Sequence, residues 1–152
     1  MLKLPLEGFF LRALPEGFLG IFAVYAFSGV RVNVKRFIIA SISLGIALYL
    51  VRFLPIKFGI HTMIGLLIHI IIAFQINKIE IVSSITSSLL YVVCLAIGEA
   101  LTVPFITSYL NMTVEELLGS SMSNIAGIPS LIFVLLVVSV TYSIKKRFNK
   151  LK

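Results

Sequence analysis

The segment from Ile81 to Val103 constrains the fold of this chain more than any other part of the sequence. It carries a single charged side chain, Glu99, over a length that exceeds the roughly 20 residues a helix needs to cross the hydrocarbon core of a bilayer. The whole chain shares this character, because only 12% of its 152 residues are charged, whereas soluble domains carry about a quarter. So few polar groups could not cover the surface of a water-soluble fold. The sequence therefore predicts an all-α integral membrane protein.

We predict one transmembrane domain over residues 1–152, a bundle of about five spanning helices. The predicted spans cover approximately residues 14–30, 37–54, 59–76, 81–103 and 124–144. Pro104 is expected to end or kink the fourth span, because proline lacks a backbone N–H and clashes with the preceding turn. A short amphipathic element is expected at residues 108–123, where Thr113 and Glu116 have the spacing of a capping box.

An odd number of spans puts the two termini on opposite sides of the membrane, so the distribution of Lys and Arg sets the orientation. Most of the 13 basic residues lie in segments that fall on one side, namely residues 31–36, Lys78 and the basic tail 145–152. By the positive-inside rule that side is cytoplasmic, which predicts an outer N-terminus and a cytoplasmic C-terminus. We expect the basic tail to face anionic lipid rather than nucleic acid.

Small residues recur at four-residue spacing, which places them on one face of a helix and lets neighbouring helices approach closely. The pairs are Ser41 with Gly45, Ser83 with Ser87, Ser84 with Ser88, and Ser123 with Gly127. They predict a packed bundle and carry no chemistry of their own.

Four ionisable residues are predicted to form a ligand-binding polar cluster at the outer side of the membrane: Glu16, Arg52, His61 and Glu99. Glu99 lies about 18 residues into its span, which puts it near the outer boundary at about 1.5 Å per residue. Arg52 can offset the cost of charge in lipid by bridging Glu16 or Glu99. Simpler interpretations stay open. Arg52 can extend to the headgroups, Glu16 can be an exposed residue that the helix dipole favours at the helix N-terminus, and His61 can cap its helix.

The two histidines are not expected to share a metal ion. His69 lies about 12 Å deeper than His61 and about 80° around the helix, and no tight ligand motif such as H-E-x-x-H is present. We predict no catalytic and no metal-binding residues and assign no cofactor. His69 is expected to be neutral and hydrogen-bonded within the bundle. Cys94 is the single cysteine, so it cannot form an intramolecular disulfide and is expected to be a small buried hydrophobe.

Five short motifs occur in an order that resembles a known kind of membrane module. They are PEGF (Pro15–Phe18), VRFLPIKFGIHT (Val51–Thr62), GEALTVP (Gly98–Pro104), TVEELLG (Thr113–Gly119) and GIPS (Gly127–Ser130). Together they span nearly the whole chain and resemble the N-terminal multi-span sensor module of bacterial GHKL-class sensor histidine kinases from Gram-positive lineages. The resemblance implies a location in the bacterial cytoplasmic membrane and transfer of a signal to a cytosolic kinase.

The chain departs from that pattern at its end. The 152 residues contain no phosphoacceptor domain, dimerisation helix or ATP-binding Asn and Gly boxes. We therefore expect either an excised module or a stand-alone relative that acts through a cytoplasmic signalling protein or as a homo-oligomer. The resemblance implies neither kinase activity nor any particular ligand-binding residue.

These features favour a non-enzymatic sensory or regulatory module, in which a ligand or a proton binds the outer polar cluster and a cytoplasmic partner reads the change. One alternative is a small solute transporter or the substrate-binding subunit of an uptake system, because intramembrane charges also mark transport pathways. Another is a membrane enzyme that acts on a lipid or a quinone, with Glu99 and His61 as acid and base.

Overall fold

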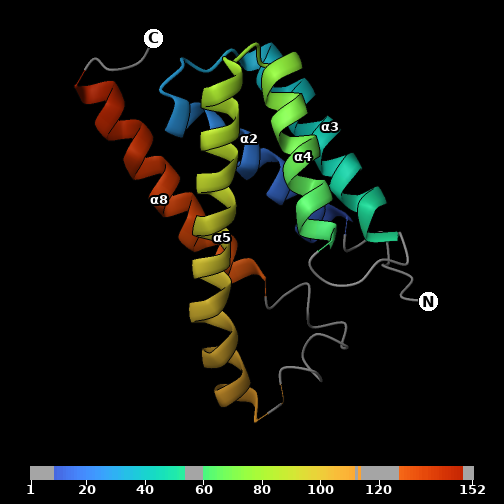
Figure 1. Cartoon of the computed structure of the whole chain (residues 1–152). Helices are drawn as coiled ribbons and strands as arrows, with labels where there is room; N and C mark the ends of the chain where they lie inside the picture. Colours follow the sequence, from blue (N-terminus) through green and yellow to red (C-terminus); the bar gives the residue numbers. More distant parts are fainter. Residues whose placement is uncertain (1–8, 54–59, 112, 114–126, 149–152) are drawn as a thin grey trace.

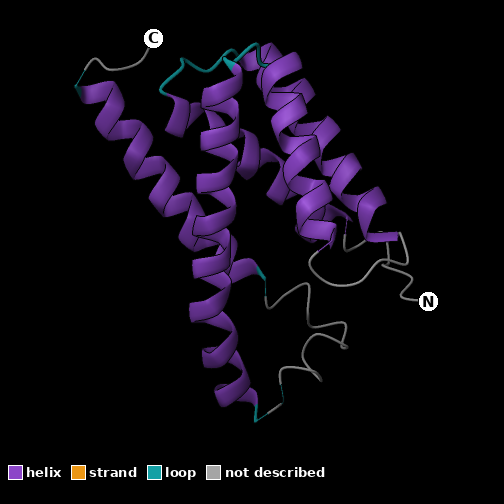
Figure 2. Ribbon diagram, viewed as in Figure 1, coloured by secondary structure: helices purple, strands orange, loops and turns teal. Residues whose placement is uncertain are grey.

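The computed structural model describes residues 9–53, 60–111, 113 and 127–148, and every regular element in these ranges is a helix (Figures 1 and 2). The elements are a π-helical turn η1 (Phe9–Ala13) and the α-helices α2 (Leu14–Ser28), α3 (Val34–Phe53), α4 (Ile60–Gln75), α5 (Ile81–Leu110) and α8 (Ile128–Arg147). Each α-helix overlaps one of the predicted spans. No strand occurs among the described residues, which confirms the predicted all-α class.

Three of the helices, α3, α5 and α8, have the length and the apolar composition needed to cross a bilayer. Helices α2 and α4 are also apolar but shorter, with 15 and 16 residues. Large aliphatic side chains such as Leu67, Val82 and Leu136 are exposed on the outside of the bundle. Such a surface is costly in water and inexpensive against lipid chains, so the chain is a membrane protein.

Helix α2 lies at the centre of the bundle and contacts each of the other α-helices (Figure 1). On one side it packs with α3 and α4 around Ile21, Tyr25 and Leu44. On the other side it packs with α5 and α8 around Ala23 and Val134. The longer helices therefore surround α2 and provide most of the surface that faces lipid.

Gly17 lets α2 and α3 approach closely. A Cβ atom at this position would lie 2.7 Å from the backbone N of Gly45 and 2.7 Å from the carbonyl O of Ser41, closer than real atoms allow. Ser41 and Gly45 are one of the pairs whose four-residue spacing predicted a close helix contact. The structure adds Gly17 as the residue that opposes them.

Local capping explains where two helices differ from the predicted spans. Helix α3 begins at Val34 rather than Phe37, because the Asn33 side chain accepts a hydrogen bond of 3.3 Å from the backbone N–H of Arg36, the usual role of an N-cap. Helix α2 ends at Ser28, because Gly29 follows it with φ of 74°, the left-handed conformation that ends many helices.

Of the two outcomes predicted for Pro104, ending the helix is wrong, since α5 runs on to Leu110. The hydroxyl of Thr107 donates to the carbonyl of Pro104 at 3.0 Å. This bond does not replace the missing one, because the carbonyl that proline deprives of an N–H partner is that of Ala100, four residues earlier. Helix α5 has 30 residues, about 45 Å at 1.5 Å per residue, and it extends beyond the other helices (Figure 1).

Some of the predicted features lie outside the described residues. These are the start of the last span at 124–126, most of the amphipathic element at 108–123, and the Glu116 side of its capping box. Within that element, Ser108 to Leu110 form the end of α5.

Replacing Gly17 with alanine is expected to destabilise the protein by about 1–3 kcal/mol, because the added methyl group must push two helix backbones apart. The matched control is Gly20→Ala, whose Cβ would have side-chain atoms of Leu44 and His69 as its three nearest neighbours, at 3.3–3.4 Å, rather than backbone atoms. Unfolding in detergent can be followed by the reaction of the single cysteine, Cys94, with a thiol-reactive dye on heating. Equal unfolding midpoints for the two variants would contradict the close contact.

Candidate functional site

Two ion pairs lie at the end of the bundle where α2 begins and α3 ends. The guanidinium of Arg12 in η1 donates from Nη2 to Glu99 Oε1 in α5 at 3.1 Å. The guanidinium of Arg52 in α3 donates to the carboxylate of Glu16 in α2. We call these four residues the ion-pair cluster. Together they join η1, α2, α3 and α5 at one level of the bundle.

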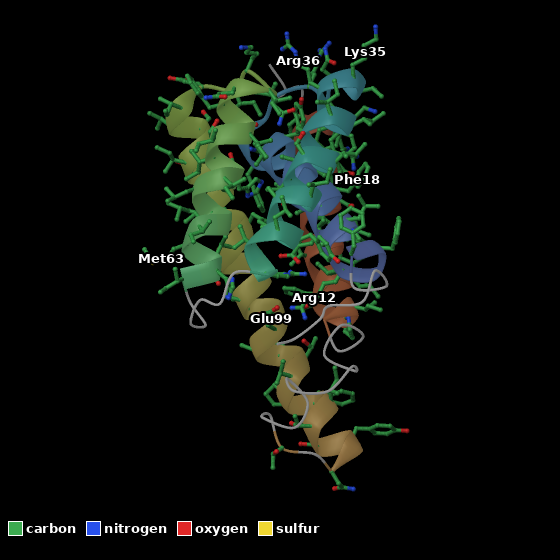
Figure 3. All side chains as sticks on the ribbon, turned by 90° about the vertical axis from the view of Figure 1, so that its right-hand side faces the viewer. Arg12, Phe18, Lys35, Arg36, Met63 and Glu99 are labelled. Carbon is green, nitrogen blue, oxygen red and sulfur yellow. The ribbon has the colours of Figure 1, made fainter. Side chains whose placement is uncertain are left out.

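The ion-pair cluster lies most of a hydrocarbon-core thickness away from the end of the bundle that carries Lys35 and Arg36, which we call the basic end. Arg36 and Arg52 are separated by about 24 Å of helix at 1.5 Å per residue, and a hydrocarbon core is about 30 Å thick. Figure 3 shows Lys35 and Arg36 together at one end and the pair of Arg12 and Glu99 far from them. In a bilayer the cluster therefore falls near the boundary opposite the basic end.

The two ion pairs differ in how far they are enclosed. The side chains of Arg52 and Glu16 are 23% and 13% exposed, and those of Arg12 and Glu99 are 24% and 40% exposed. The hydroxyl of the buried Tyr91 also donates to the backbone carbonyl of Glu16 at 3.4 Å. The pair of Arg52 and Glu16 is therefore the more structural of the two, whereas the pair of Arg12 and Glu99 is more open to a ligand.

The structure brings together three of the four residues that the sequence predicted as a cluster. The sequence offered Glu16 and Glu99 as partners for Arg52. In the structure, Arg52 pairs with Glu16. Glu99 pairs with Arg12, which the sequence-based cluster did not include. A signal for Arg12 was present, because it lies four residues before Glu16 in a continuous helical stretch and such residues share a helix face.

His61, the fourth predicted residue, lies in the first turn of α4 and its side chain is half-buried. Helix α4 begins where α3 ends, so His61 is at the same end of the bundle as Arg52 (Figure 1). Neither of the two ion pairs includes it.

His69 is buried in the middle of the bundle. Its ring lies edge-on to that of Tyr91, with centroids 5.3 Å apart and an interplanar angle of 82°. Its other neighbour is Gly20, where a Cβ atom would lie 3.4 Å from the imidazole Nε2. The predicted internal hydrogen bond does not form at Nε2, which has no hydrogen-bond partner among the described residues. The ring packs against Tyr91 in space that Gly20 leaves for it.

The basic end of the bundle has its own polar contacts. Lys145 near the end of α8 donates to the backbone carbonyl of Phe27 in α2 at 2.7 Å. The Tyr25 hydroxyl donates to Asn77 Oδ1 at 2.9 Å between α2 and the end of α4. A cation at a helix C-terminus is favourable because the last carbonyls of the helix have no partner of their own. Helix α8 is thus tied to α2 at the end opposite the ion-pair cluster.

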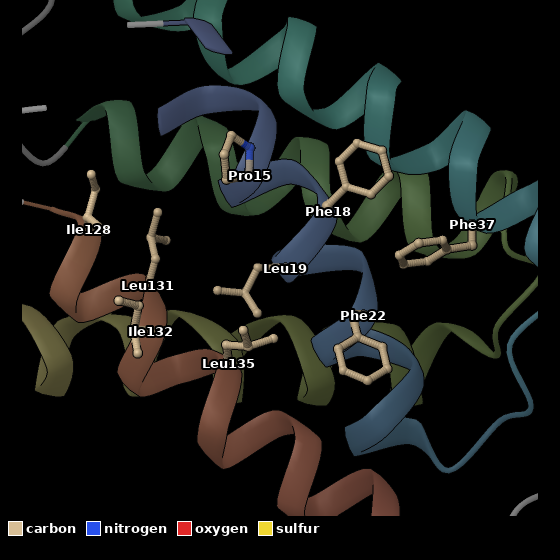
Figure 4. Close-up of a pocket in the computed structure, with 9 residues that line it drawn as sticks. All are labelled: Pro15, Phe18, Leu19, Phe22, Phe37, Ile128, Leu131, Ile132 and Leu135. Carbon is tan, nitrogen blue, oxygen red and sulfur yellow. The ribbon is translucent and has the colours of Figure 1, made fainter. Parts of the chain in front are cut away.

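An apolar groove runs between α2 and α8 and encloses about 470 Å³, a size typical of small-molecule sites. Its lining residues come from α2, α3 and α8: Pro15, Phe18, Leu19, Phe22, Phe37, Ile128, Leu131, Ile132 and Leu135 (Figure 4). One end of the groove meets the ion-pair cluster. There, Pro15 directly precedes Glu16, and the guanidinium of Arg12 lies against Gly127, where a Cβ atom would be 3.0 Å from Arg12 Cζ.

The charged groups of the ion-pair cluster define what the site could bind. The ion-pair cluster offers two guanidinium groups and two carboxylates, which can hold an ion, a zwitterion or a proton. Within the described ranges, no three His, Cys, Asp or Glu side chains gather as metal ligands.

Comparisons of the chain with protein-family models, curated proteins and solved structures returned no match. The resemblance to the sensor module of GHKL-class kinases therefore stays a prediction from sequence motifs, and the function has to be argued from geometry.

Removing the carboxylate of Glu16 is expected to destabilise the protein more than removing that of Glu99. Glu16→Gln leaves Arg52 largely enclosed without a counter-charge, and losing one partner of a fully buried pair costs about 3–5 kcal/mol. Partial exposure lowers this to about 1–3 kcal/mol for Glu16, and Glu99→Gln is expected to cost about 1 kcal/mol or less. The Cys94 heating assay in detergent measures both.

The charge-reversed double variant Glu16→Arg with Arg52→Glu is the control for specific pairing. It is expected to recover part of the stability that each single reversal loses, because the opposite charges again face each other. If the double variant loses as much stability as the two single variants together, the pairing is contradicted.

Proposed function

We propose that the chain is a non-enzymatic sensory or regulatory module of the bacterial cytoplasmic membrane. The observation that carries this proposal is that Arg12 of the ion-pair cluster contacts the start of α8 and Lys145 ties the other end of α8 to α2. At one end, Arg12 bridges Glu99 and packs on Gly127 at the start of α8. At the other end, Lys145 bonds the carbonyl of Phe27 in the central helix.

A ligand or a proton that weakens the pair of Arg12 and Glu99 changes the contact between Arg12 and Gly127 at the start of α8. Glu99 is the most exposed carboxylate of the cluster, so it is the group a ligand reaches first. Signalling requires that the ligand binds two packings of the bundle with different affinity. In this mechanism, one packing keeps Arg12 against Gly127 and the other releases the start of α8. A cytoplasmic partner reads the movement at the far end of α8.

The orientation belongs to the same proposal. The positive-inside rule places the basic end, with Arg36 and Lys145, in the cytoplasm. The ion-pair cluster then faces the outside, where an external or a lipid-borne ligand arrives. This polarity matches the suggested kinship with the membrane modules of sensor kinases.

Transport is the second candidate, and buried polar groups within the bundle favour it. The hydroxyls of Ser41 and Ser88 and the Nε2 of His69 are buried without a hydrogen-bond partner among the described residues. Such groups can line a path for protons or water. Proton flux into proteoliposomes that is abolished by His69→Ala would favour transport over sensing.

Breaking the pair of Arg12 and Glu99 is expected to move the far end of α8. Spin labels at Lys35→Cys and Arg147→Cys, in a Cys94→Ser background, report the distance between α3 and α8 at the basic end. Arg12→Gln is expected to shift or broaden the distance distribution measured by pulsed electron paramagnetic resonance, because α8 loses a contact at its start. The matched control is Thr102→Val, which removes a hydroxyl bonded only within α5. Identical distributions for both variants would overturn the proposed coupling.

Cysteine labelling tests the orientation. In a Cys94→Ser background, Tyr109→Cys at the projecting end of α5 is expected to react with a membrane-impermeant maleimide in intact bacterial cells, since this position is exposed. Lys146→Cys is expected to react only after the cells are permeabilised. The reverse pattern would show that the basic end lies outside.

A further inference from the structure

The apolar groove between α2 and α8 has one end, at Pro15 and Ile128, that adjoins the ion-pair cluster, and we call this its polar end. Its lining begins at Pro15 and Ile128, beside Glu16 and beside the Gly127 on which Arg12 packs, and extends to Phe22 and Leu135 in the interior. If the ion-pair cluster lies near a bilayer boundary, the groove, whose lining is shown in Figure 4, extends from that boundary toward the hydrocarbon region. An amphiphile fits this layout better than a wholly apolar or wholly polar ligand.

The charges at the polar end indicate what kind of headgroup fits. The pair of Arg12 and Glu99 presents a cation and an anion side by side, and both side chains are partly exposed. A purely anionic headgroup would meet Arg12 but would be repelled by Glu99. A zwitterion with a phosphate and a primary ammonium complements both, because guanidinium donates to phosphate and carboxylate accepts from ammonium.

We infer that the groove binds one acyl chain of a phospholipid of the phosphatidylethanolamine class, with its phosphate at Arg12 and its ammonium at Glu99. This inference rests on the proposed function, for which it names the ligand class. The acyl chain fills a concave apolar surface formed by α2, α3 and α8, and the headgroup competes with the bridge between Arg12 and Glu99. Binding of this lipid therefore alters the contact between Arg12 and the start of α8.

Native mass spectrometry of the full chain tests the inference. The delipidated protein is mixed with equal amounts of phosphatidylethanolamine, phosphatidylglycerol and phosphatidylcholine, and the lipid retained on the protein is measured. We expect phosphatidylethanolamine to be retained in preference to the other two by about tenfold or more. Phosphatidylcholine carries no N–H donor for Glu99, so it separates an ammonium hydrogen bond from a charge effect. Equal retention of the three lipids would overturn the headgroup assignment.

A matched pair of variants on α8 tests the groove. Ile132→Trp places a large ring in the groove, whereas Val140→Trp enlarges a similarly exposed side chain of the same helix that does not line it. We expect Ile132→Trp to lower retention of phosphatidylethanolamine by about tenfold and Val140→Trp to leave it unchanged, with the Cys94 heating assay verifying that both variants fold. Equal retention by the two variants would overturn the groove as the binding site.

Failure of this inference is distinguishable from failure of the proposed function. If no lipid preference appears but Arg12→Gln still moves the far end of α8, the coupling stands and the lipid assignment is wrong. If lipid binds as expected but the spin-label distances do not respond to Arg12→Gln, the groove is a structural lipid site and the sensory function is wrong.

Discussion

The cost of placing charge in or beside hydrocarbon organises this structure. Translocon scales put it at about 2.5–3.5 kcal/mol for Arg, Lys or Asp at the centre of a membrane helix, and opposite charges that face each other reduce it. Here two arginines and two glutamates from η1, α2, α3 and α5 meet at one level and neutralise one another. The pairs fix which helix ends lie together, and the close contact of Gly17 with Ser41 and Gly45 fixes how near α2 and α3 come. Helix α8 is then positioned by its packing against α2 and α5 and by the contact of Arg12 with Gly127.

The fold class was readable from the sequence because apolar runs of membrane length leave few other folds. The helix boundaries were less readable, since they depend on single residues such as the Asn33 cap and the left-handed Gly29. Of the two outcomes predicted for Pro104, ending the helix was wrong, because a membrane helix can continue through proline. One side of the closest helix contact could be read from the spacing of Ser41 and Gly45. The opposing residue, Gly17, could not be predicted, because residue spacing within one helix does not show which other helix it faces.

The sequence indicated at which height of the bundle the candidate site lies, but not which of its residues pair with each other. Counting residues along alternating helices places Glu16, Arg52 and Glu99 at a common height, since helical rise is constant. Pairing depends on how each helix is rotated about its axis, and a spacing argument between helices does not provide that angle. Arg12 was therefore missed as the partner of Glu99. The groove could not be predicted from the sequence for the same reason. It depends on how α2 and α8 are placed relative to each other and not on a motif.

The pairing of Arg12 with Glu99 and of Arg52 with Glu16 in a lipid bilayer is the central claim, and solid-state NMR measures it directly. Protein labelled with 15N in the arginine guanidinium groups and 13C in the glutamate carboxyl groups is reconstituted into liposomes, and the nitrogen–carbon dipolar coupling is recorded. Glu16→Gln and Glu99→Gln variants assign the signal to each pair. The account predicts a strong short-range coupling that each variant reduces and that both together abolish. A coupling that is absent, or that neither variant changes, would contradict it.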